Sequence, residues 1–123
     1  MYLLTYRTDF AAAHQLRGYR GKCENLHGHN FKVEVTVKGT ELDRCGMLVD
    51  FMDLKAAVNG CLETLDHRNL NDLPYFATTV NPSAENVARY VYEEVAKALP
   101  KVATVEQVTV YETDRCSATY RLS

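Results

Sequence analysis

The segment HGHNFKVEVTVKG, residues 27–39, decides the fold. From Phe31 onward, apolar residues at odd positions alternate with polar residues at even positions until Gly39. A period of two residues predicts a β-strand with one buried face and one solvated face. His27 and His29 share the odd parity of the apolar residues. Their imidazoles are therefore predicted to project toward the covered face, where polar groups need partners.

Three further segments alternate in the same way. They are residues 1–10, the stretch around Val108 and Val110, and residues 118–122 after a turn near Asp114. His14 keeps the even parity of the first strand if no bulge intervenes, and Glu112 keeps the parity of Val108 and Val110. We therefore expect three histidines and one carboxylate on the covered side of one sheet, where each needs a partner.

Two segments have the helical period instead. Apolar residues over 54–65 recur at intervals of three and four, which predicts an amphipathic helix. A second helix is predicted from the N-cap residue Ser83 to Leu99. The order ββααββ predicts a single α+β domain over residues 1–123, with a four-stranded antiparallel sheet and two helices on one face.

The composition narrows the class of protein. The formal net charge is −2, with 46% hydrophobic and 24% charged residues, which is typical of a globular protein and argues against nucleic acid as the main partner. The start MYLLTYRTDF lacks the basic start, apolar core and cleavage site of a secretion signal, and no later stretch suits a bilayer. We expect a cytoplasmic protein with reduced cysteines and no membrane partner.

The histidines suggest a metal site. His27 and His29 stand at the spacing that one metal ion accepts, and His14 adds a third imidazole from the neighbouring strand. Three histidines without a fourth protein ligand form an open zinc site of the catalytic kind, which polarises hydroxyls or carbonyls or acidifies water. A cluster of hydrogen-bonded histidines would give the same pattern, so the residues alone leave both interpretations open.

Cys23, four residues before His27, has three interpretations. It can be a fourth metal ligand, which would make the site structural, or a loop thiol without a function. It can also be a thiolate that acts as base or nucleophile beside the metal, a form that Arg20 and Lys22 would favour as neighbouring cations. No function is assigned to the other three cysteines, Cys45, Cys61 and Cys116, of which Cys61 belongs to the apolar stripe of the first helix.

Asp66 and His67 directly follow that stripe, in the segment LDHRNLND. A histidine at a helix C-terminus can simply be a cap, because its positive charge faces the negative end of the helix dipole. Alternatively, His67 is a general acid–base whose tautomer is set by the Asp66 carboxylate. None of the four histidines falls where a plain surface residue is expected, which favours the catalytic interpretation.

Six segments of the chain are similar to segments of the 6-pyruvoyltetrahydropterin synthase / 6-carboxytetrahydropterin synthase family. They are AAAH (11–14), CENLHGHN (23–30), GMLVDFMDLK (46–55), LDHRNLND (65–72), NPSAENVA (81–88) and YET (111–113). The resemblance spans nearly the whole chain. Several of the segments are short, but six in the family's order are specific together.

The resemblance implies a role for each candidate residue. The ligands of a Zn²⁺ cofactor would be His14, His27 and His29. Cys23 would be the thiolate that removes a proton, with Asp66 and His67 as the partner acid–base pair. Glu112 would hold the pterin ring. The implied architecture is the tunnelling fold, in which protomers join into a ring, typically a homohexamer, with active sites at subunit interfaces.

The resemblance also implies 7,8-dihydroneopterin triphosphate as the substrate. Three residues separate Cys23 from His27, as in the bacterial 6-carboxytetrahydropterin synthases of queuosine biosynthesis, whereas the 6-pyruvoyl enzymes have a longer separation. This favours a zinc-dependent lyase that forms 6-carboxytetrahydropterin and releases acetaldehyde and triphosphate. The alternative is a 6-pyruvoyltetrahydropterin synthase, and remoter alternatives are a non-enzymatic structural-zinc module and a zinc hydrolase.

Overall fold

Two long strands form the centre of the fold, as their alternating sequence predicts. β1, Tyr2–His14, and β2, His27–Gly39, pair antiparallel along their whole length, with His14 opposite His27 at one end. The computed structural model describes residues 1–21 and 24–123. The remaining elements are α1 (Phe51–Leu62), β3 (Arg68–Asn69), the 3-10 turns η1 (Leu70–Asp72) and η2 (Pro74–Phe76), α2 (Ala84–Ala98), β4 (Thr104–Thr113) and β5 (Cys116–Tyr120).

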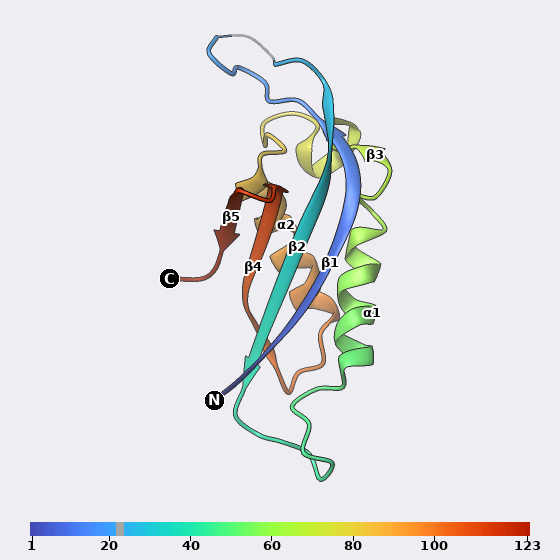
Figure 1. The fold of residues 1–123 in the computed structure, drawn as a ribbon, viewed down its shortest axis with the longest axis vertical. Helices are drawn as coiled ribbons and strands as arrows, with labels where there is room; N and C mark the ends of the chain where they lie inside the picture. The colour runs from blue at the N-terminus through green and yellow to red at the C-terminus, as the bar shows by residue number, and fades with distance from the viewer. Residues whose placement is uncertain (22–23) are drawn as a thin grey trace.

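The hydrophobic core lies between the sheet and the two helices, which share one side of the sheet (Figure 1). Strand residues of the predicted parity face this core and are at most 2% exposed: Phe10, Phe31, Val33, Val35, Val37, Val108 and Val110. In β4 the register shifts, so that Thr36 lies opposite Gln107 while Val37 lies opposite Val105. The extra residue of this bulge lets Val105 and Val108 both face the core.

Both helices start with a side-chain cap. Asp50 caps α1 and Ser83 caps α2, and each side chain accepts a hydrogen bond from a backbone N–H of the first turn. The prediction for α2 is confirmed almost to the residue. α1 ends at Leu62, where the chain turns. This is one turn before the end of the apolar stripe, whose last residue, Leu65, is still fully buried. Within the described residues, no helix is long and apolar enough to cross a membrane.

The sheet has five strands, so the prediction of four antiparallel strands is wrong at one edge. β3 pairs parallel to β1, with Arg68 opposite Ala12 and Asn69 opposite Ala13, and the order is β3-β1-β2-β4-β5. A strand of two residues is too short to show an alternating pattern. Its pairing depends on where the chain lies after α1, which local sequence does not reveal.

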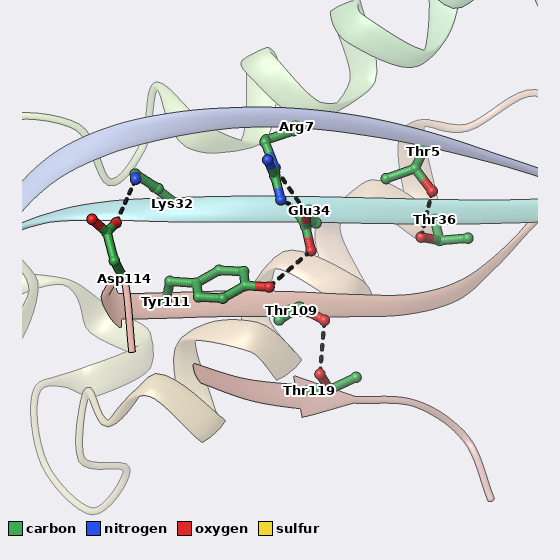
Figure 2. A network of polar contacts seen from close by, with 9 residues as sticks. All are labelled: Thr5, Arg7, Lys32, Glu34, Thr36, Thr109, Tyr111, Asp114 and Thr119. Carbon is green, nitrogen blue, oxygen red and sulfur yellow. Dashed lines mark hydrogen bonds and ion pairs between the residues drawn. The ribbon is translucent and has the colours of Figure 1, made fainter. Parts of the chain in front are cut away.

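The helix-free face of the sheet is polar and carries cross-strand contacts (Figure 2). Glu34 of β2 accepts hydrogen bonds from Arg7 of β1 and from the Tyr111 hydroxyl of β4. Further pairs on this face are Thr5–Thr36, Thr109–Thr119 and Lys32–Asp114. Because these polar groups bond to one another across the strands, the face needs no helix to cover it.

Candidate metal centre

Three histidines meet at the end of the β1–β2 ladder, on the covered face. His14 and His27 are register partners, and His29 lies opposite Ala12 on the next residue of the same parity. The ring centroids of His14 lie 4.7 Å from His27 and 5.1 Å from His29, and those of His27 and His29 are 4.8 Å apart. One nitrogen from each ring lies within 4.8 Å of the others. The predicted convergence of these three side chains is confirmed.

Backbone carbonyls fix the tautomers of two of these rings. Nδ1 of His14 lies 2.7 Å from the carbonyl oxygen of Pro82, and Nδ1 of His27 lies 2.8 Å from that of Asn25. A carbonyl only accepts, so each Nδ1 is the donor, and in the neutral ring Nε2 then carries the lone pair. This is the usual outer-shell arrangement of metal-binding histidines.

The donor set fits a metal such as zinc. Nε2 of His14 and Nε2 of His29 are buried, and neither has a hydrogen-bond partner among residues 1–21 and 24–123. Buried polar atoms rarely go without a partner, and two of them that face one centre indicate a ligand. Burial also lowers the pKa of His29, which keeps its imidazole neutral, the form that binds metal. Three neutral imidazoles can hold Zn²⁺ and leave one coordination position for another ligand.

Glu112 reaches this cluster from β4, as its parity predicts. Its Oε1 lies 3.8 Å from Nε2 of His14. The same residue lines a cavity of about 280 Å³, together with Ser83 and Glu85 at the start of α2 and Cys116 of β5. Glu112 therefore lies between the three histidines and a cavity beside them.

The Asp66–His67 pair lies on the edge of β1. Asp66 Oδ1 accepts a hydrogen bond from the N–H of Ala11 at 2.9 Å, and the N–H of His67 donates to the Ala11 carbonyl at 2.6 Å. Asp66 Oδ2 lies 2.9 Å from Nδ1 of His67, so the carboxylate sets the tautomer and leaves Nε2 free. The hydrogen bonds from Ala11 and His67 lower the pKa of Asp66. The carboxylate therefore ties the turn to β1.

The pair lies apart from the three histidines. His67, with a positive φ of 59°, points into solvent and its side chain is 81% exposed. His67 and His29 both line a depression of about 580 Å³, together with Ala11, Gly28 and Asn30 among others. Within residues 1–21 and 24–123, no hydrogen bond or ion pair links Asp66 or His67 to the three histidines. The expectation that no histidine is a plain surface residue therefore fails for His67 in the single chain.

Cys23 lies outside the described residues. Two hydrogen bonds join Leu16, before it in the chain, to Glu24, after it. The Glu24 N–H donates to the Leu16 carbonyl at 3.0 Å, and the Leu16 N–H donates to Glu24 Oε1 at 3.1 Å. The other three cysteines are free thiols, and Cys61 is buried in the core as predicted.

Sequence reasoning missed two asparagines that hold the chain just after His14. Asn71 accepts from the N–H of Gln15 at 2.8 Å and donates to its carbonyl at 2.9 Å. Asn81 bonds Arg17 in the same two-way manner, at 2.9 Å for each bond. Asn81 immediately precedes the carbonyl that orients His14. Both asparagines lie in segments 65–72 and 81–88, so the motif itself was the available signal.

Comparisons with known proteins agree with this geometry. A family model described as 6-pyruvoyl tetrahydropterin synthase matches residues 3–123. The 6-pyruvoyl tetrahydrobiopterin synthase of Homo sapiens is 40% identical over 129 residues, which cover 94% of this chain and 88% of the relative. A putative 6-carboxy-5,6,7,8-tetrahydropterin synthase of Archaeoglobus fulgidus is 38% identical over 107 residues, covering 87% and 84%. The structure of Caenorhabditis elegans 6-pyruvoyl tetrahydropterin synthase, 33% identical, superposes with a TM-score of 0.83 over 100% of this chain and 98% of that one.

Proposed function

We propose, from the premise that this chain belongs to the 6-pyruvoyl tetrahydropterin synthase family of pterin-processing lyases, that it is a zinc-dependent 6-carboxytetrahydropterin synthase. The substrates would be 7,8-dihydroneopterin triphosphate and one water, and the products 6-carboxy-5,6,7,8-tetrahydropterin, acetaldehyde and triphosphate, on the route to queuosine. The observation that carries the proposal is the three-histidine cluster, with buried and unpartnered Nε2 atoms on His14 and His29.

Each candidate residue then has one task. The three histidines hold Zn²⁺, which when bound supplies Lewis acidity toward the hydroxyls of the substrate side chain. Cys23, as a thiolate, removes a proton from that side chain. His67 returns or removes a proton elsewhere, since Asp66 occupies its Nδ1 and leaves Nε2 free for the transfer. Glu112 accepts hydrogen bonds from the N–H groups of the pterin ring, a two-oxygen contact that suits a carboxylate.

The position of His67 supports a shared active site. Its ring is exposed beside the open face, whereas the three histidines are on the covered face, so the described part of one chain does not place the His67 ring in the histidine cluster. Most of β1 and all of β5 also present unpaired edges within the described part of the sheet. Strands of other copies can pair with such edges. We propose a homohexameric ring in which His67 of one subunit serves the metal centre of another.

The short spacing between Cys23 and His27 favours the 6-carboxy product. The two kinds of relative match this chain at nearly the same identity, 40% and 38%, so overall identity does not separate the two reactions. The spacing determines where the Cys23 sulfur meets the substrate side chain. A displacement of about 1 Å in a catalytic group is enough to change which proton transfer is fast.

The test is incubation of the zinc-loaded protein with 7,8-dihydroneopterin triphosphate, mass spectrometry of the pterin product and trapping of volatile aldehyde. We expect a one-carbon carboxyl substituent at C6 and one acetaldehyde per turnover. A product with the full three-carbon side chain and no aldehyde would identify a 6-pyruvoyl synthase instead. Zinc without any pterin turnover would favour the structural-zinc module, and cleavage of a simple ester would favour a hydrolase.

A further inference from the structure

We infer that Leu16 is the apolar wall on which the flat ring of the substrate lies, and that the residues bonded to the backbone around it hold this wall in place. The inference rests on the proposed pterin site and adds to it a residue that determines which rings bind. Leu16 is the second residue after His14, just beyond the end of β1. It lines the cavity of about 280 Å³ that Glu112 also lines.

The side chain of Leu16 does not contribute to the hydrophobic core. It is half-buried, yet among residues 1–21 and 24–123 it belongs neither to the core nor to the partly buried residues packed against it. Besides Glu112, the other residues that line the cavity are small or polar: Ser83, Ala84, Glu85, Cys116, Ser117 and Ala118. Leu16 is therefore the one large apolar side chain that the described part of the chain offers to a ligand in this cavity.

The backbone around Leu16 is held by hydrogen bonds in both directions. The N–H and the carbonyl of Gln15 bond to the Asn71 side chain at 2.8 and 2.9 Å. The same two groups of Arg17 bond to the Asn81 side chain, both at 2.9 Å. Those of Leu16 itself bond to the Glu24 carboxylate at 3.1 Å and to the Glu24 N–H at 3.0 Å. All six backbone groups of three successive residues therefore have partners.

These bonds fix the direction of the Leu16 side chain. A surface loop normally leaves its backbone groups to water and moves more than the elements that it connects. Two of the partner residues are themselves held, since the Asn71 N–H donates to the Asn69 side chain at 3.1 Å and Asn86 donates to the Asn81 carbonyl at 2.9 Å. The wall is therefore ordered before a ligand arrives, which reduces the loss of entropy on binding.

Glu112 and Leu16 suit the two kinds of surface that a pterin ring has. The edge of the ring carries N–H donors, which the carboxylate accepts in the proposed site. The faces of the ring are flat and bind well against an apolar side chain that keeps water away from them. Leu16 has no polar atom in its side chain, so it recognises the ring and not the substituent at C6. Its contribution is to binding, and the proton transfers do not depend on it.

The first experiment measures by calorimetry how tightly the zinc-loaded, full-length protein binds pterin without a C6 side chain. We expect Leu16→Ala to weaken binding about tenfold, because an apolar contact is lost, and Leu16→Met to stay within about threefold of wild type. Leu4→Ala is the matched control, since Leu4 is also half-buried but packs against the core. It should lower the thermal midpoint and leave the affinity unchanged. Unchanged affinity in Leu16→Ala, or an equal loss in Leu4→Ala, would overturn the inference.

The second experiment separates binding from catalysis and from subunit packing. With the full substrate, Leu16→Ala should raise KM about tenfold and keep kcat within about twofold, as expected when a contact made equally in the ground state and the transition state is removed. Sedimentation should show the same oligomer as wild type. A fall in kcat at constant KM would assign the side chain to the chemical step. Dissociation of the oligomer would assign it to contact with another subunit, and either result would overturn the inference.

The third experiment tests whether Asn71 acts through Leu16. Asn71→Ala removes both bonds to Gln15 and should weaken pterin binding about threefold to tenfold, with one zinc per chain retained. Adding this change to Leu16→Ala should weaken binding no further, because Asn71 then has no apolar wall to position. Additive losses would overturn the positioning role. Wild-type protein that binds zinc but no pterin would instead overturn the proposed function, and this inference with it.

Discussion

The metal centre and the Asp66–His67 pair use the same kind of side chain in opposite surroundings. His14 is 1% exposed and lies against two half-buried histidines at the end of the β1–β2 ladder, whereas the side chain of His67 is 81% exposed at the edge of β1. Each arrangement is held by backbone groups: carbonyls orient His14 and His27, and Ala11 anchors Asp66 and His67. Backbone groups thus hold both the histidine cluster and the Asp66–His67 pair in place, but the described part of the chain does not join the two.

The two arrangements differ in what a single chain supplies to them. Buried imidazole nitrogens that lack hydrogen-bond partners in the described structure are stabilised when a ligand binds them, and one chain can hold that ligand. An exposed histidine with a fixed tautomer is not stabilised by the hydrophobic core of its own chain. Its second ring nitrogen can exchange a proton with another molecule. Four experiments can test this contrast between a buried candidate metal centre and an exposed Asp66–His67 pair.

The largest effect is expected from His27→Ala. Loss of one of three nitrogen ligands should remove the metal and lower turnover by roughly 10³-fold or more, because the Lewis acid is lost. The matched variant is His67→Ala, which should retain one metal per chain and lower turnover by about 10²–10⁴-fold. Elemental analysis and turnover assays on both proteins check this. Full metal content in His27→Ala would refute the assignment of the centre.

The next effect distinguishes a shared site from a site within one chain. Cys23→Ala and His67→Ala should each lose most of their turnover, yet subunits mixed by refolding together should regain part of it. If each site takes the thiol from one subunit and the imidazole from another, random assembly restores about a quarter of the sites. Turnover of the mixture, compared with each variant refolded alone, is the measurement. No recovery in verified mixed oligomers would mean that both groups come from the same chain.

A smaller effect is expected from Asn81→Ala, which removes the two-way bonds to Arg17 beside the carbonyl that orients His14. Looser orientation of this ligand should weaken metal binding about tenfold, a typical outer-shell effect. Asn59→Ala is the control, since Asn59 accepts a hydrogen bond from Tyr6 away from the metal centre. Chelator competition measures both affinities. Equal losses in the two variants would indicate general destabilisation.

The smallest effect concerns acid stability. The pKa of Asp66 is lowered in the folded chain, so its carboxylate stabilises the fold above its unfolded pKa of about 3.9, and this contribution is lost as pH falls through the folded pKa. The effect is modest because the side chain is 41% exposed. Denaturation at several pH values should show wild type more stable than Asp66→Asn at pH 6, with the difference vanishing on acidification. A gap independent of pH would contradict this.

Much of the metal centre was predictable because strand parity is a local property. A residue two positions along a strand returns to the same face, so His27 and His29 follow Phe31, and Glu112 follows Val110. Cap residues gave the start of α2 in the same local way. β3 and the asparagine contacts were not predictable, because they join residues far apart in sequence. The two-way bond of Asn71 to Gln15, for example, spans 56 residues.

Residue type and strand period, which are local properties, predicted which side chains are candidates for the chemistry and which face of each strand they occupy. Only the tertiary structure decided which of them meet. It brought His14 against His27 through the register of β1 and β2, and placed Glu112 3.8 Å from His14 across the sheet. It also anchored Asp66 and His67 to Ala11, on the outer edge of β1. The physical reason is that pairing and packing act between distant segments, whose relative positions are fixed only when the core closes.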